Sequence, residues 1–304
     1  MTKQLALTFT VLLILGILFL YKSGIDQFPM VQAAADIQLG KRLYVQNCAG
    51  CHGERGDGKG PEVSRLKTKP RDFTIGIYKF RSTPSGSLPN DKDIFRTISQ
   101  GVRTTSMLAQ LHLSEGERWT LTGYLKTLSE RFKTEKPSDP IPIPAEPSTI
   151  SDLVTLGKRL YADAGCAQCH GSEGKGDGPS AKDLKDDWGN PISPPDLTLR
   201  PFKSGSGPED LYRTLSTGLN GTPMPSYAAA FSANERWALV LYILSIATHD
   251  RPKGMMGLVG EEVEGMRIDM RAAMAGMMGG KGMMGRGGGM MDRNMKDMMK
   301  DQGK

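Results

Sequence analysis

An internal duplication sets the domain organisation of this chain. Residues 40–44 read GKRLY and recur as residues 157–161, and the CAGCH sequence of residues 48–52 recurs as CAQCH at residues 166–170. Ordered matches continue at a nearly constant offset through the rest of each copy. A unit of ~100 residues is long enough to bury its own core, so the duplication predicts two tandem domains rather than a solenoid.

The remaining sequence divides around the two copies. We expect an N-terminal segment over 1–30, a first domain over 31–133, a linker over 134–150, a second domain over 151–249 and a tail over 250–304. The linker contains five prolines. Because prolines at this density favour an extended polyproline II conformation, the linker is predicted to be a semi-rigid spacer that holds the domains apart or docks them in few arrangements.

Both copies have a helical pattern. Apolar residues at three- and four-residue spacing predict helices over 36–49 and 152–167, and each of these runs into a cysteine pair. Acidic residues, which favour the N-terminus of a helix, open two more predicted helices over 91–99 and 209–216.

The last helix of each copy carries a capping box. Ser114 and Ser232 precede the apolar run, and Glu117 and Glu235 follow three residues later. These helices are predicted to extend through residues 128 and 246. The connecting loops are rich in Gly and Pro and show little strand signal, so we predict an all-α fold. Its long ordered loops can be accommodated in a domain of this size only if something fills the centre of the domain.

All four cysteines lie in C-x-x-C-H motifs, one in each copy. The motifs consist of Cys48, Cys51 and His52, and of Cys166, Cys169 and His170. Two thiols three positions apart on a helix end can each bond to one haem vinyl group, and the next residue then places its imidazole under the iron. The motifs therefore predict two covalently bound haem c groups with His52 and His170 as proximal ligands.

Two other interpretations of the cysteines are less favourable. A four-cysteine zinc site needs the pairs ~15 to 20 residues apart, whereas these pairs lie in separate repeats. A thioredoxin-like motif would not explain a histidine directly after both pairs, and its βαβ context is absent from the sequence pattern.

Each copy resembles a class I cytochrome c domain. In that family the helix before the haem crosses the last helix through a glycine and an aromatic residue one turn apart. The matching residues are Gly40 and Tyr44, which face Tyr124, and Gly157 and Tyr161, which face Tyr242. The resemblance also implies that the carbonyl groups of Pro61 and Pro179, which each follow a glycine, accept a hydrogen bond from the proximal imidazole.

The same resemblance implies a methionine as the distal iron ligand. Met224 lies in the sequence GLNGTPMP over 218–225, and Met107 falls on the same register in the first copy. An axial Met paired with His raises the reduction potential of a haem. The Met107 loop lacks the two prolines, and His112 follows five residues later, so His112 in place of Met107 is an alternative that would lower the potential of the first haem.

The N-terminal segment predicts a membrane anchor. Residues 4–21 are an 18-residue stretch without charge, bracketed by Lys3 and Lys22, which is just long enough to cross a bilayer. A cleaved signal peptide with a site at 33–35 is the alternative, but eleven residues separate that site from the apolar run. Since the resemblance implies haem attachment outside the cytoplasm, we expect both haem domains on the periplasmic side of a bacterial cytoplasmic membrane.

The tail has an unusual composition. Of the 51 residues in 254–304, 27 are Met or Gly. Thioether clusters select Cu(I), so copper binding is one hypothesis, although no His or Cys accompanies the methionines. A disordered tail, an oxidant sink and an apolar docking strip are the alternatives.

Charge is distributed unevenly between the copies. Residues 31–133 carry 17 Lys and Arg against 10 Asp and Glu, a balance of +7, whereas residues 151–249 carry 9 against 11, a balance of −2. The basic residues are scattered and form no nucleic-acid-binding motif, which excludes DNA and RNA as partners. The imbalance indicates a docking surface for an acidic protein, with an ordinary solvated surface as the alternative.

These features predict a membrane-anchored dihaem cytochrome c that passes single electrons between a redox donor and acceptor and is not itself an enzyme. Two irons with both axial positions filled leave no site for a substrate. The alternative is a dihaem peroxidase, which by family resemblance would need a further histidine ligand, and only His112 and His249 are available. The anchor, spacer and tail fit a fixed subunit of a larger complex as well as a free shuttle.

Overall fold

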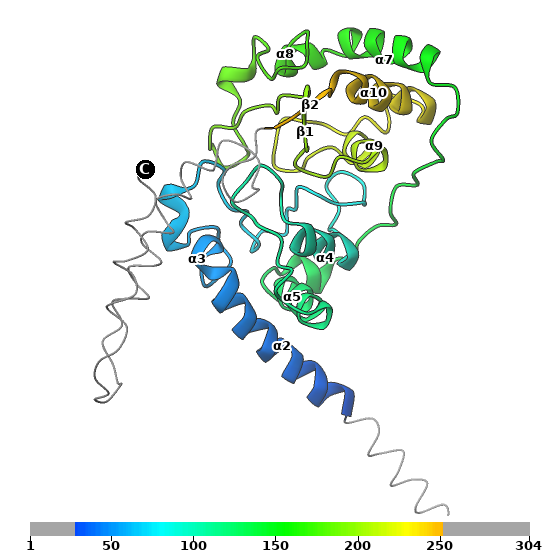
Figure 1. The fold of residues 1–304 in the computed structure, drawn as a ribbon. Helices are drawn as coiled ribbons and strands as arrows, with labels where there is room; N and C mark the ends of the chain where they lie inside the picture. Colours follow the sequence, from blue (N-terminus) through cyan, green and yellow to red (C-terminus); the bar gives the residue numbers. More distant parts are fainter. Residues whose placement is uncertain (1–27, 252–304) are drawn as a thin grey trace, which may run out of the picture. The chain divides into compact units, whose positions relative to one another are not determined.

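The computed structural model describes residues 28–251, which are helix-rich with little strand (Figure 1). The first copy contains α2 (Phe28–Asn47), α3 (Ala49–His52), η1 (Pro61–Arg65), α4 (Asp91–Gln100), α5 (Glu115–Thr127) and α6 (Arg131–Thr134). The second contains α7 (Ser151–Asp163), α8 (Cys166–His170), η2 (Ala181–Asp183), β1 (Leu199–Arg200), α9 (Pro208–Thr217), α10 (Ala233–Ile246) and β2 (His249–Asp250). Strands β1 and β2 pair in parallel.

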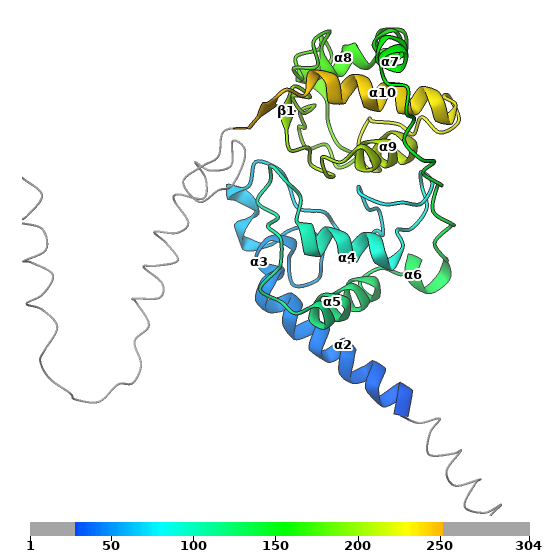
Figure 2. The same cartoon turned by 45° about the vertical axis from the view of Figure 1, so that its right-hand side comes forward.

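The first and last helices of each copy cross at a glycine. A Cβ atom on Gly40 would lie 2.6 Å from Cβ of Tyr124, and one on Gly157 would lie 2.8 Å from Cβ of Tyr242 and clash with the carbonyl of Ala238. Helix α2 therefore packs directly on α5, and α7 on α10, as Figure 2 shows for the second copy. The predicted crossings are confirmed.

The helix boundaries differ from the predicted ones chiefly in the helices that precede the cysteine pairs. Helix α2 begins at Phe28, eight residues before the predicted start, because its first turns include three consecutive alanines, the residue with the highest helix propensity. The helix predicted over 152–167 is divided into α7 and α8. Gly165 between them has a φ of 73°, a left-handed conformation that ends a helix.

The capping boxes of the last helices are formed as predicted. The backbone N–H of Glu117 donates to Ser114 Oγ at 3.3 Å, and Oε2 of Glu117 accepts a hydrogen bond from the Ser114 backbone at 2.8 Å. Ser232 and Glu235 repeat both contacts at the same distances.

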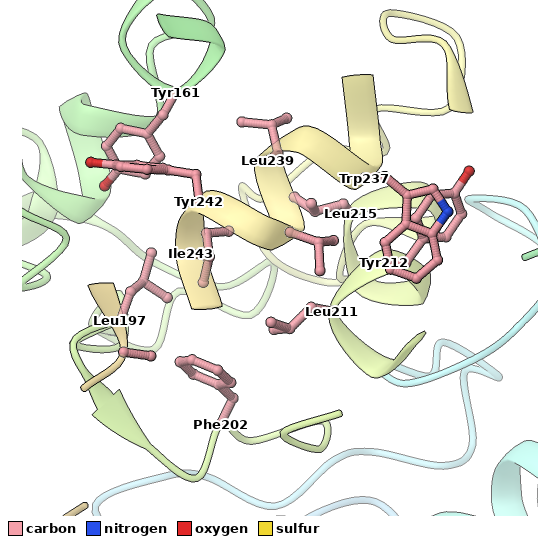
Figure 3. Packing of buried hydrophobic residues seen from close by; sticks show 12 residues of the cluster. Tyr161, Leu197, Phe202, Leu211, Tyr212, Leu215, Trp237, Leu239, Tyr242 and Ile243 are labelled. Atoms are coloured by element: carbon pink, nitrogen blue, oxygen red, sulfur yellow. The ribbon is translucent and has the colours of Figure 1, made fainter. Parts of the chain in front are cut away.

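Each copy has its own hydrophobic core. In the second copy the rings of Tyr212 and Trp237 pack in a tilted arrangement between α9 and α10, with their centroids 4.7 Å apart. Phe202 and Leu197 complete the far side of the cluster (Figure 3). The core of the first copy includes Leu43, Tyr44, Phe73, Ile94, Ile98, Leu121 and Tyr124.

The linker is docked against the first copy. The backbone N–H of Ile141 donates to the carbonyl of Ser82 at 2.8 Å, and that of Ser138 donates to Ser87 Oγ at 3.1 Å. Ile143, two residues after Ile141, packs against the core of the second copy. The linker therefore lies against the first copy and reaches the core of the second.

None of the helices within residues 28–251 is long and apolar enough to span a bilayer. The predicted anchor over 4–21 and the Met/Gly-rich segment over 254–304 lie outside the described residues.

Candidate haem sites

The two C-x-x-C-H motifs occupy equivalent short helices. Cys48 is the N-cap of α3, which ends at His52, and α8 runs from Cys166 to His170. None of the four cysteines forms a disulfide bond within the described residues, and all four are partly buried. Within residues 28–251 no group of three or more His, Cys, Asp or Glu side chains could hold a metal ion. The thiols are therefore available for covalent attachment, and the described residues offer no zinc site.

A buried tyrosine fixes the chain directly after each proximal histidine. The hydroxyl of Tyr44 donates to the carbonyl of Gly53 at 2.7 Å, and that of Tyr161 donates to the carbonyl of Gly171 at 2.7 Å. These tyrosines were expected only as packing residues. The repetition of a tyrosine four residues after the crossing glycine was the signal of a second role.

The proximal imidazole of the first copy is held by a backbone carbonyl. Nδ1 of His52 lies 3.0 Å from the carbonyl oxygen of Arg71, which leaves Nε2 as the nitrogen that can bind iron. In the second copy burial lowers the pKa of His170 and the carbonyl of Pro195 opposes this effect in part, although Nδ1 makes no regular hydrogen bond within the described residues.

The predicted roles of Pro61 and Pro179 as acceptors were therefore wrong. Both prolines are exposed, whereas the imidazoles are partly buried. The preceding glycines explain the repeated Gly-Pro pair. A Cβ atom on Gly60 would lie 2.6 Å from the backbone oxygen of Ala49 in the first C-x-x-C-H motif. One on Gly178 would lie 2.5 Å from the backbone oxygen of Ala167 in the second motif. Each Gly-Pro turn therefore packs directly against its motif.

Burial controls the protonation of the proximal histidines. It lowers the pKa of both His52 and His170, and the carbonyl contacts oppose this effect only in part. A lowered pKa keeps the imidazole neutral near pH 7, which is the form that binds a metal.

The loops that carry the two methionines share one hydrogen-bond pattern. The carbonyl of Met107 accepts from the backbone N–H of Val102 at 2.8 Å, and that of Met224 accepts from Leu219 at 3.1 Å. The hydroxyl of Thr105 accepts from the Met107 N–H at 3.2 Å, and Thr222 does the same for Met224 at 3.4 Å. The structure thus presents Met107 and Met224 in equivalent loops.

His112 lies elsewhere on the first copy. Its Nε2 atom is 3.0 Å from Oδ1 of Asn47 at the end of α2, in an exposed hydrogen bond. The ring is therefore engaged at the surface, whereas Met107 occupies the loop position that matches Met224.

Several buried polar atoms have no hydrogen-bond partner within residues 28–251 and would suit a bound haem. Nη1 of Arg81 and the hydroxyl of Tyr78 are buried and unpaired in the first copy, as are the hydroxyl of Tyr212 and Nε1 of Trp237 in the second. A buried donor left unpaired is costly, and the carboxylates of a haem are acceptors of the required kind. A small cleft lined by Lys79, Arg81, Arg96 and Arg213 adds positive charge for such carboxylates.

Comparison with known proteins agrees with this arrangement. The model of the cytochrome c family matches residues 37–129 and 154–247. A chain of the reducing HAO-like protein complex of Kuenenia stuttgartiensis shares 45% sequence identity, with a TM-score of 0.67 over 68% of this chain and 95% of that chain.

Proposed function

Since this chain belongs to the cytochrome c family, we propose that it is a membrane-anchored dihaem c-type cytochrome that transfers single electrons between respiratory redox complexes. Haem-based electron transfer follows from the family. The observation that supports two haems in one electron carrier is the duplicated site: a C-x-x-C-H helix and a methionine loop with the same hydrogen bonds occur in each copy.

Haem c supplies a one-electron couple at its iron, and the chain sets how that couple works. The two cysteine pairs would hold one haem each by covalent bonds. His52 and His170 offer a neutral imidazole, and the carbonyl of Arg71 fixes the ring orientation and tautomer of His52. Met107 and Met224 are the candidate distal ligands, and a thioether ligand from each would raise the potential of its haem.

We favour the role of a haem subunit within a larger complex over that of a free shuttle. The observation behind this preference is the 45% identical chain, which is part of an HAO-like complex and is covered over 95% of its length. The donor and acceptor would then include subunits of one assembly. Two filled iron sites would leave the chemistry of any substrate to other subunits.

The cellular location is part of the same proposal. The uncharged stretch over residues 4–21 supports an N-terminal anchor, and haem attachment outside the cytoplasm supports a periplasmic position for both domains. Carbonate extraction of membranes, together with protease accessibility in spheroplasts, tests both points. Release of the full-length chain by carbonate would contradict the anchor.

Purification in mild detergent tests the functional proposal. We expect two covalent haems per chain, reversible one-electron reduction of each, and co-migrating redox subunits. An assay with hydrogen peroxide and a reduced carrier separates this function from that of a peroxidase. Turnover of peroxide at rates typical of enzymes, ~10 per second, would contradict an electron-transfer role.

A further inference from the structure

The loop that presents Met224 is contacted by residues of the first copy. Nη2 of Arg81 donates to the carbonyl of Thr217, directly before the loop, at 2.6 Å. Within the loop, Oδ1 of Asn220 accepts from the Ser85 hydroxyl at 3.0 Å. Arg81 is only 1% exposed, so the first of these contacts is fully shielded from water.

Arg71 makes a third contact with the same loop. Its guanidinium carbon lies 4.3 Å from the ring centroid of Trp188 in the second copy. A Cβ atom on Gly221 would lie 2.5 Å from Nη1 of Arg71 and 2.6 Å from the Trp188 ring. The backbone N–H of Asp187 donates to the carbonyl of Gly221 at 3.2 Å, which ties the segment carrying Trp188 to the loop.

The duplicated loop shows why glycine is needed at position 221. Thr104 occupies the matching position, three residues before Met107, with a φ of 63° against 79° for Gly221. The loop backbone therefore tolerates a side chain in this left-handed conformation. In the first loop a half-buried threonine side chain stands at the position where Arg71 and Trp188 pack against Gly221 in the second.

Arg71 belongs to both sites, because its carbonyl oxygen holds His52 while its side chain packs at Gly221. Resting on the proposed function, we propose that the first copy clamps the distal-ligand loop of the second, with Arg71 as a positioning residue shared by the two haem sites. Placement of the Met224 sulfur then depends on side chains of the first copy. Since the axial ligand tunes the potential, the two haems are coupled through this contact.

Redox titration of the full-length protein with both haems attached tests the clamp. Arg71→Gln removes the stacking and the charge but keeps the carbonyl that holds His52. Trp188→Leu removes the other half of the contact, and Trp188 is 37% exposed, so this variant should fold. The control is Arg55→Gln, because Arg55 is also in the first copy but makes an exposed ion pair with Asp57.

We expect Arg71→Gln and Trp188→Leu each to change the ratio of reduced to oxidised second haem at fixed potential by at least about threefold. The upfield methyl signal of iron-bound Met224 in the reduced protein, assigned by its loss in Met224→Ala, should shift in both variants. Arg55→Gln should change neither readout.

An Arg71→Gln or Trp188→Leu protein with unchanged potential and methyl signal at the second haem would overturn the clamp. Haem content measured on the same samples keeps this result separate from the proposed function. A wild-type chain with two covalent haems and reversible reduction retains that function whether or not the clamp exists.

Discussion

The hydroxyl group of Tyr44 donates a 2.7 Å hydrogen bond to the carbonyl oxygen of Gly53, the residue after the proximal His52. Tyr161 and Gly171 repeat this bond at the same distance. Each bond joins the first helix of a domain to the turn that follows the haem-attachment motif. A disturbance of the first helix is therefore transmitted directly to the position of the imidazole.

We expect Tyr44→Phe and Tyr161→Phe each to lower the free energy of unfolding of its domain by about 1 kcal/mol. The expected loss is the net value of one hydrogen bond, since the packing of the ring is retained. Guanidinium titration followed by far-UV circular dichroism measures it. Because the contacts are equivalent, similar losses in the two variants are expected, and no loss in either would show that water replaces the hydroxyl at no cost.

Covalent haem content should fall by one when either cysteine pair is removed. Cys48→Ala with Cys51→Ala leaves only the second attachment site, and Cys166→Ala with Cys169→Ala leaves only the first. The mass of the denatured chain after acid-acetone extraction gives the number of haems directly. A wild-type mass with a single haem would refute the use of both motifs.

Replacement of either loop methionine should lower the potential of its haem. We expect Met107→Ala and Met224→Ala each to cause a fall on the order of 0.1 V, within the ~0.8 V range that axial ligands span. His112→Ala should leave both potentials unchanged, because Nε2 of His112 is hydrogen-bonded to Asn47. A changed potential of the first haem in His112→Ala, together with no change in Met107→Ala, would identify His112 as the ligand instead.

Local signals in the sequence predicted the elements that lie close together along the chain. The C-x-x-C-H motifs end short helices, and Ser114 with Glu117 forms a capping box, because both features depend on residues within one or two turns. The crossing glycines were also expected, because the Gly and Tyr one turn apart in each copy match the helix crossing of class I cytochrome c domains.

Contacts between distant loops were not predictable. The acceptor for His52 is the carbonyl of Arg71, nineteen residues away, and every residue offers a carbonyl whatever its type. The bond from Arg81 to Thr217 spans 136 residues, and no spacing rule connects the two positions. The prediction that Pro61 and Pro179 are the acceptors was wrong because the residue type does not indicate which backbone carbonyl accepts the hydrogen bond.

The capping boxes predict a dependence of stability on acid. Hydrogen bonds from Ser114 lower the pKa of Glu117 below its ordinary value of 4.5, and Ser232 has the same effect on Glu235. A lowered folded-state pKa means that the carboxylate stabilises the fold above the unfolded pKa, and that this contribution is lost as the pH falls through the folded value. We therefore expect the contribution of these carboxylates to stability to be lost below pH 4.5.

Glu117→Gln and Glu235→Gln test this dependence, because Gln retains the capping hydrogen bonds without a titratable group. We expect each variant to be less stable than the wild type at pH 7. The difference should disappear in acid, as urea unfolding at a series of pH values would show. A difference that stays constant from pH 7 to pH 3 would exclude ionisation of the Glu as its cause.

The excess of positive charge on the first domain predicts that anions react there. Residues 31–133 have a balance of +7, against −2 for residues 151–249. Lys41 and Arg42 are exposed on α2, and the duplication places Lys158 and Arg159, also exposed, at the matching positions of α7. Attraction between exposed charges raises association rates and is screened over ~8 Å at physiological salt.

Stopped-flow oxidation of the reduced protein by the anion ferricyanide measures this effect. Lys41→Glu with Arg42→Glu should slow the reaction by roughly tenfold at low ionic strength, and the difference should shrink as salt is added. The matched control, Lys158→Glu with Arg159→Glu, makes the same change in charge on the second domain and should have a smaller effect. With the cationic oxidant tris(phenanthroline)cobalt(III), the first variant should react faster than the wild type. Equal effects of the two variants on ferricyanide oxidation would mean that the uneven charge is an ordinary solvated surface and that electrons do not leave preferentially through the first domain.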